Sequence, residues 1–504
     1  MPPRFSLRTR ASGVLLHPTS LPGSHGVGDL GDGALRFAEQ LASLGQSWWQ
    51  MLPVGPTGWG NSPYSARSSF SGNPLLLSLH RLLDKGVLDP GDVVPVPGLV
   101  PGRVDYPEAG RFKEARLRRA FEEFERRGVP ADFETFRAET PWLADDALYS
   151  ALAGTRGGAW WDWDPGIRGR DPDALERARK DLAREIQFHE FVQFVFDRQW
   201  RRFRDHCASI GIGLIGDVPF FAPSDSVDVW AWQDHFDLDE TGRARTVAGA
   251  PPDPFNWDGQ RWGHPQYRWD VHRERGYAWW IERLRITFRR FDAVRIDHFI
   301  GFHRSWAIPA SSPTAKEGAW AAGPGAEFFE KLHAALGPLE LIAEDLGIVP
   351  AQVHELRDRL DLPGIRVIQF GLLGDEGASI HLPPKYPRRC VAAPGTHDND
   401  TAAGWYASVQ DPAARDRVRR TLSADDRDVP WAMVRAVMAS PADVVIVPMQ
   451  DVLGLGSEAR MNVPGVPEGN WDWRIPEGAL TPGLLARFRD VTRETGRTPG
   501  GRPG

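Results

Sequence analysis

The stretch Phe291–Phe302, FDAVRIDHFIGF, decides the fold prediction, because in it a short β-branched apolar run delivers an arginine and then an acid into a loop. Side chains two apart in a strand share one face, so Arg295 and Asp297 are expected to point the same way. An arginine beside a carboxylic acid favours the ionised acid near neutral pH. An ionised Asp297 can act as a nucleophile, although a lone Arg-x-Asp pair is more often a structural ion pair.

Two later stretches repeat the pattern of an apolar strand that ends in acids. LELIAEDL at 339–346 contains Glu344 and Asp345, and CVAAPGTHDND at 390–400 contains His397 and Asp398. A single acid after a strand is usually the N-cap of the next helix. Three in succession are expected to form one site, because the loops that follow the strands of an α/β barrel meet at one face.

Eight apolar runs are expected to be strands: 12–16, 47–54, 211–220, 291–297, 339–344, 365–370, 391–393 and 443–447. Helical patterns separate most of them, for example at 34–44 and 276–288. This alternation predicts an α/β protein with a (β/α)8 TIM barrel and with helical and loop insertions between the barrel strands. A doubly wound sheet is the alternative, but the chain has neither a Gly-rich dinucleotide fingerprint nor a GxxxxGK[ST] phosphate loop.

The domain organisation follows from where the alternation stops. We expect residues 1–74 to begin the barrel, residues 75–208 to form a mainly helical insertion subdomain, and residues 209–490 to complete the barrel with loop insertions over the active site. Residues 491–504 are expected to be a disordered tail. The stretches 222–230 and 247–269, rich in Pro, Gly and Trp, predict irregular structure.

The composition of the chain limits the kinds of partner and cofactor that it is expected to bind. The chain is 25% charged with a net charge of −7, so no basic surface suggests nucleic acid. Only Cys207 and Cys390 are present, without metal-ligand spacing, and no calcium motif occurs, so we expect no disulfide framework, no metal and no cofactor. The apolar run Val14–Leu16 is too short for a signal peptide and nothing resembles a membrane span, so a cytoplasmic protein is expected.

The aromatic content is unusual, with 21 Trp and 25 Phe against 7 Tyr. Many of these tryptophans occur in Gly- and Pro-bearing, loop-like sequence. Sugar rings pack their apolar C–H faces on flat aromatic surfaces, which would explain the surplus. Burial in the core would explain it equally well.

Acids after the fourth, fifth and seventh strands suit glycoside chemistry of the retaining type, which needs a nucleophilic carboxylate and a proton-donating carboxylic acid about 5 Å apart. Asp297 is the expected nucleophile. Glu344 is the expected acid/base, because a partly desolvated glutamate near another carboxylate has a raised pKa. His397 and Asp398 are expected to hold the hydroxyls of the reacting sugar.

The chain resembles the 4-α-glucanotransferases of glycoside hydrolase family 77, also called amylomaltases or disproportionating enzymes. The resemblance rests on VRIDHF, IAEDLG and GTHDND, with NSPY before them, GAPPDPF and GQRWG between, and RMNVPGVPEGNWDWR near the end, and it covers about Gly13 to Arg474. It implies transfer of a segment of an α-1,4-glucan to the 4-hydroxyl of an acceptor glucose or glucan, through a glycosyl-aspartate. By this resemblance Asp297 is the nucleophile, Glu344 the acid/base and Asp398 the transition-state stabiliser.

The same resemblance implies further substrate contacts. The subsite of the reacting glucose would be lined by Arg295, His397, Asp217 and Tyr64, and neighbouring subsites by Ser62, His298, Gln260 and Trp262. Trp59 matches a second sugar-binding patch, and Phe255 matches part of a mobile aromatic loop.

The chain departs from the family pattern at three places. Pro254 stands where the family commonly has the first of two aromatics, Leu373 replaces an acid, and Pro384 with Lys385 replaces His-Asn. Acceptor preference and product size are therefore open.

Two other functions are compatible with parts of the pattern. An α-amylase-like hydrolase would use the same carboxylates but pass the sugar to water. A catalytically idle glucan-binding barrel would have lost the nucleophile or the acid, and this chain keeps all three carboxylates. The oligomeric state is not predicted.

Overall fold

The computed structural model describes residues 5–95, 102–252, 256–374 and 377–499. Its centre is a closed barrel of eight parallel strands in the order β1-β12-β11-β10-β9-β6-β3-β2. This confirms the predicted (β/α)8 barrel. The strands are β1 (Ala11–Leu15), β2 (Trp48–Gln50), β3 (Gly213–Val218), β6 (Ala293–Ile296), β9 (Leu341–Ala343), β10 (Gly364–Val367), β11 (Cys390–Ala393) and β12 (Val444–Pro448).

Every barrel strand is buried along its whole length, as expected of parallel strands covered on both faces. Several are shorter than the apolar runs that predicted them. The run 47–54 contributes β2 over three residues only, and the run 365–370 ends as a strand at Val367 because Ile368 begins a helix. Apolar sequence therefore continues beyond the strands, into a buried loop after β2 and into a helix after β10.

Register in the barrel brings the acids of neighbouring strands together. β3 pairs with β6 so that Asp217 lies opposite Arg295, and β6 pairs with β9 so that Ile296 lies opposite Ala343. The residues that follow these strands, Asp297 and Glu344, therefore emerge side by side.

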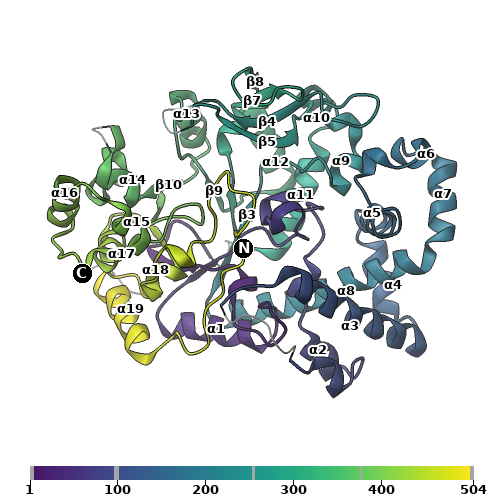
Figure 1. The fold of residues 1–504 in the computed structure, drawn as a ribbon, viewed down its shortest axis with the longest axis horizontal. Coiled ribbons are helices and arrows are strands. Elements are labelled where there is room, and N and C mark those ends of the chain that lie inside the picture. Colours follow the sequence, from purple (N-terminus) through teal and green to yellow (C-terminus); the bar gives the residue numbers. More distant parts are fainter. Residues whose placement is uncertain (1–4, 96–101, 253–255, 375–376, 500–504) are drawn as a thin grey trace.

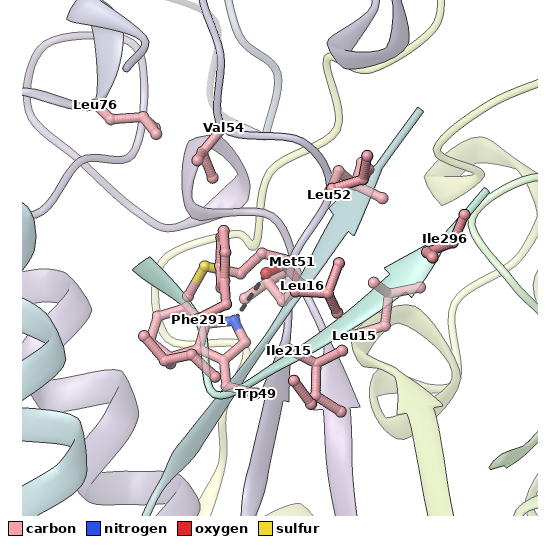
Figure 2. Close-up of a cluster of buried hydrophobic side chains, with 14 of the residues drawn as sticks. Leu15, Leu16, Trp49, Met51, Leu52, Val54, Leu76, Ile215, Phe291 and Ile296 are labelled. Atoms are coloured by element: carbon pink, nitrogen blue, oxygen red, sulfur yellow. Dashed lines mark hydrogen bonds between the residues drawn. The ribbon is translucent and has the colours of Figure 1, made fainter. Parts of the chain in front are cut away.

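Figure 2 shows part of the core at the junction of β1, β2 and β3, where Trp49, Met51 and Ile215 pack with Phe291 from the segment before β6. Burial in the core accounts for a large part of the tryptophan surplus. The tryptophans that are almost completely buried are Trp48, Trp49, Trp160, Trp200, Trp230, Trp279 and Trp280.

The described residues between β2 and β3 form helices on one side of the barrel (Figure 1). The longest, α8, packs its aromatic residues against the other helices at one end and against Trp49 and Phe291 of the barrel at the other. The division of the chain at residues 74 and 208 stays a prediction. These helices are α2 (Leu79–Asp84), α3 (Tyr106–Arg127), α4 (Ala131–Ala138), α5 (Leu143–Arg156), α6 (Pro165–Arg168), α7 (Pro172–Asp181) and α8 (Ala183–Ser209).

A second, antiparallel sheet lies at the top of the view in Figure 1, with the order β5-β4-β7-β8. The expectation of irregular structure over residues 247–269 was wrong for the parts that form β4 and β5, which pair despite their glycines and proline. Pairing of β4 with β7 ties this insertion to the segment just after the fourth barrel strand. The strands are β4 (Thr246–Ala250), β5 (Gln260–Pro265), β7 (Arg304–Pro309) and β8 (Ala319–Ala322).

The other α-helices of the described residues are α1 (Asp32–Ser43), α9 (Val227–Ala231), α10 (Trp269–Glu274), α11 (Ala278–Arg290), α12 (Ala326–Leu336), α13 (Ala351–Arg359), α14 (Ile368–Leu373), α15 (Ala402–Ser408), α16 (Pro412–Leu422), α17 (Val429–Ala439), α18 (Met449–Leu453) and α19 (Pro482–Glu494). Within the described ranges, no helix combines the length and apolarity needed to cross a membrane.

The predicted disordered tail begins too early. Residues 491–494 complete α19, and Arg497 is fully buried, donating hydrogen bonds to the carbonyl groups of Met438, Ala11 and Asp443. The prediction failed because these contacts are tertiary and leave no local pattern in a stretch rich in Gly and Pro. Residues 500–504 lie outside the described residues.

Candidate active site

A buried ion pair stands at the ends of β3 and β6. The guanidinium of Arg295 donates to both oxygens of Asp217 at 2.8 Å and lies 2.9 Å from Oδ1 of Asp297. Burial alone would lower the pKa of Arg295, but the two carboxylates outweigh it and hold that pKa well above its ordinary value. Arg295 therefore stays charged beside both carboxylates.

Glu344 follows β9, directly beside Asp297. Its Oε2 accepts a hydrogen bond from the backbone N–H of His298 at 2.8 Å, and its Oε1 accepts one from the N–H of Leu346 at 3.0 Å. Burial raises the pKa of Glu344 to about 7; Arg295 opposes this rise and the charge of Asp297 adds to it. The site thus contains one carboxylate next to a cation and one carboxyl group that keeps its proton until the pH approaches about 7.

Asp398 is held by the loop that follows β11 and by a distant segment. His397 Nε2 lies 3.3 Å from Oδ2 of Asp398, and Asn462 Nδ2 donates to its Oδ1 at 2.6 Å. Arg460 donates to the backbone carbonyl of Asp398 at 2.6 Å. The Asp398 side chain remains 44% exposed, so part of the carboxylate is free to meet a ligand.

Tyr64 connects this loop to the buried ion pair. Its hydroxyl donates to Oδ2 of Asp217 at 2.7 Å, and its ring stacks on His397 with 5.1 Å between ring centroids and 16° between planes. The pKa of Tyr64 is raised by burial and by the charge of Asp217, so the phenol keeps its proton. Tyr64, Arg295, Asp217 and His397, which were expected to share one subsite, are in contact.

The residues expected to contact the substrate outside the subsite of the reacting glucose lie in separate groups. Trp262 and Gln260 lie on β5, where the indole N–H of Trp262 donates to Oε1 of Gln260 at 3.1 Å and the indole meets the His298 ring edge-on at 4.9 Å. Ser62 accepts a hydrogen bond from the N–H of Tyr64 at 3.2 Å. Trp59 is 75% exposed at the surface. Phe255 and Pro254 lie outside the described residues.

Three residues at this site received no role from the sequence: Arg460, Asn462 and Trp471. The first two hold Asp398, and the Trp471 ring lies 5.7 Å from Tyr64 and 5.9 Å from His397. All three belong to RMNVPGVPEGNWDWR, which contributed to the resemblance only as a motif. The available signal in the sequence was the presence of polar and aromatic residues in this motif.

Asp345, the neighbour of Glu344, faces away from this chemistry. Its side chain is fully buried, Oδ1 accepts from the N–H of Ile365 at 2.7 Å, and Oδ2 pairs with Arg357. A carboxylate so occupied is a structural anchor between β9 and β10. Over the described ranges no group of three or more His, Cys, Asp or Glu is arranged to hold a metal ion.

A closed (β/α)8 barrel that brings an arginine-paired aspartate and a proton-retaining glutamate to neighbouring strand ends defines the class of barrel enzymes that work with paired carboxylates. The family model of 4-alpha-glucanotransferases matches residues 16–481. The chain belongs to this family of glycosyl-transferring enzymes that act on α-1,4-glucans.

Individual relatives match over nearly the whole chain. The chain is 45% identical to a 4-alpha-glucanotransferase of Thermus thermophilus and 41% identical to one of Synechocystis sp., covering 97% of this chain and 99% of the relative in each case. Among solved structures, the amylomaltase from Streptococcus agalactiae in complex with acarbose superposes with a TM-score of 0.95 at 33% identity. That match covers 97% of this chain and all of that one.

Proposed function

We propose that this chain transfers a segment of an α-1,4-glucan to the 4-hydroxyl of an acceptor glucose or glucan by a retaining double displacement through a covalent glycosyl-Asp297. Its substrates would be maltooligosaccharides, starch or glycogen in the cytoplasm. One observation carries the proposal. Asp297 and Glu344 emerge from adjacent strands, one paired with Arg295 and the other buried with a pKa raised to about 7.

The first step needs a nucleophile and an acid in opposite protonation states. Arg295 lies against Oδ1 of Asp297, so we assign Oδ2 as the attacking oxygen. A bond forms between this oxygen and the anomeric carbon as the glucosidic C–O bond breaks, and Glu344 gives its proton to the departing oxygen. General acid help of this kind is worth roughly 10²- to 10⁴-fold.

The second step reverses the role of Glu344. Once Asp297 is esterified it carries no charge, so one of the influences that raise the pKa of Glu344 disappears. Glu344 is then ionised and accepts the proton of the acceptor 4-hydroxyl as that oxygen attacks the anomeric carbon. Asp297 leaves as a carboxylate, and the configuration at the anomeric carbon is retained.

Asp398 and its neighbours are assigned to the reacting sugar. Asn462 donates to Oδ1 of Asp398 and His397 lies against its Oδ2, so the carboxyl group is held in a fixed orientation in which its oxygens can accept hydrogen bonds from sugar hydroxyls. Such hydrogen bonds strengthen as the oxocarbenium-like transition state develops. The stacked Tyr64 and His397 would form one wall of the same subsite.

Neighbouring subsites are assigned to His298, Trp262, Gln260 and Ser62, with Trp59 as a surface contact for a longer glucan. Burial lowers the pKa of His298 to about 4, so its ring is neutral and suited to bonding sugar hydroxyls. Leu373 ends α14, and Pro384 with Lys385 follows in a short turn of helix. We assign these departures to acceptor preference.

Incubation with maltotriose tests the proposal. We expect free glucose and a ladder of longer maltooligosaccharides, with the total number of reducing ends unchanged, because each transfer breaks one glucosidic bond and makes another. A rise in reducing ends in step with substrate loss, without longer chains, would replace transfer by hydrolysis. No turnover at all would leave the idle-barrel interpretation.

A further inference from the structure

The backbone of Trp471 has a conformation that is rare for its residue type. Its φ angle is +67°, in the left-handed region, where a bulky aromatic residue is an outlier. Strain of this kind persists only where surrounding contacts enforce it, and it clusters at functional sites. Trp471 lies on the irregular segment Arg460–Arg474, which crosses the face of the candidate active site.

Two hydrogen bonds hold this strained residue. The N–H of Trp471 donates to the carbonyl of Met461 at 2.7 Å, which closes the segment into a loop. The hydroxyl of Tyr106, at the start of α3, donates to the carbonyl of Trp471 at 2.8 Å. The N–H of Trp471 is therefore anchored within its own segment, and its carbonyl is anchored to a residue far away in sequence.

The strained backbone directs the indole toward the candidate active site. The ring is 6% exposed and lies 5.7 Å from the ring of Tyr64 and 5.9 Å from that of His397, whose rings stack on each other. Tyr64 reaches the buried ion pair through Asp217, and His397 reaches Asp398. A displacement of Trp471 would thus shift Tyr64, which contacts Asp217, and His397, which contacts Asp398.

The same loop also positions Asp398 directly. Arg460 and Asn462 hold its backbone and its carboxylate, and Arg460 Nε donates to the carbonyl of Asn462 at 2.8 Å. The bond from Trp471 to Met461 joins this end of the loop to the aromatic end. The loop is therefore one unit that supports the carboxylate and the aromatic wall together.

We propose that Trp471 is a positioning residue for the subsite of the reacting glucose. Its indole fixes the Tyr64–His397 stack, and Tyr106 secures its strained backbone. This inference rests on the proposed function. The residue acts on the reacting sugar only through its neighbours, so its removal should lower kcat more than it changes KM. Misplacement of catalytic groups by about 1 Å costs on the order of 10²-fold.

Glycine at position 471 separates the indole from the backbone. Glycine adopts a positive φ without strain, so Trp471→Gly keeps the turn and removes only the ring. We expect kcat for maltotriose disproportionation to fall about 10²-fold, with KM changed less than about threefold and most of the activity restored in Trp471→Phe. Trp431→Phe, a change at a buried tryptophan of α17 that packs against Phe488 away from this loop, is the matched control and should keep the wild-type kcat.

Tyr106→Phe provides a test that removes a single hydroxyl and leaves its ring in place. We expect kcat to fall about threefold to tenfold, because the carbonyl of Trp471 loses its donor. The inference is overturned if Trp471→Gly has the wild-type kcat, if glycine and phenylalanine lose activity equally, or if Tyr106→Phe is fully active. If Trp471→Gly does not fold, the Phe and Tyr106 variants decide. A wild-type protein without disproportionation would instead refute the proposed function.

Discussion

Replacing Glu344 by glutamine should change how the stability of the fold responds to pH. Burial raises the pKa of Glu344 from 4.5 to about 7, and a pKa change of one corresponds to about 1.4 kcal/mol. Because the folded pKa lies above the unfolded one, the fold is most stable with respect to this group below about pH 4.5. That stability is lost as the pH rises to about 7, and the loss is constant above it.

The magnitude follows from the two pKa values. Between about pH 5 and about pH 8, ionisation of Glu344 should lower the free energy of unfolding of the wild type by about 2.5 kcal/mol. Glutamine does not ionise, so the variant escapes this loss. Its amide nitrogen faces the N–H of either His298 or Leu346, which costs about 1 to 3 kcal/mol at every pH.

The assay is therefore a comparison of urea unfolding at the two pH values. The difference in free energy of unfolding, variant minus wild type, should rise by about 2.5 kcal/mol toward the higher pH. Glu477→Gln is the control, because this exposed side chain stays in water in both states. A difference for Glu344→Gln that is the same at both pH values would refute the reasoning that this acid is buried with a raised pKa.

Three further outcomes follow from the same structure. The kcat for maltotriose should fall as the pH rises through about 7, because the proton donor Glu344 is lost, and a rate that keeps rising through that range would argue for another acid. Glu344→Gln should lose activity on maltotriose roughly 10²- to 10⁴-fold, yet it should still form the covalent intermediate from glucosyl fluoride, because fluoride leaves without a proton. Asp297→Asn should form no intermediate from either donor. Equal failure of both folded variants with glucosyl fluoride would show that Glu344 is not the acid/base. Arg497→Met should lower the free energy of unfolding by about 3 kcal/mol because buried carbonyl groups lose a charged donor, and the exposed Arg493→Met should have little effect in the same denaturation experiment.

The features of the fold that could be predicted from the sequence are those whose signal lies in neighbouring residues. The barrel was predictable because each parallel strand is a mostly apolar run. The positions of Asp297 and Glu344 at neighbouring strand ends were predictable because each comes directly after such a run, and Asp398 lies in the loop that follows another. The antiparallel sheet was not predictable, because β4 and β5 contain glycine or proline and gain their regularity from pairing with each other and from the pairing of β4 with β7.

The rest of the site depends on contacts between distant residues. Asn462 reaches Asp398 across 64 positions of sequence, and Tyr106 reaches Trp471 across 365. No periodicity reports such contacts, and the segment that carries Asn462 and Trp471 has little regular structure. The burial of Arg497 escaped prediction for the same reason.

Trapping of the covalent intermediate tests the central claim most directly. A fluorinated α-glucosyl fluoride that slows the second step should label the protein once, and mass spectrometry of its peptides should place the sugar on Asp297. The label should be absent in Asp297→Asn. A sugar attached to Asp345 or Asp398, or steady release of glucose from the wild type without any labelled peptide, would contradict a mechanism in which Asp297 is the nucleophile.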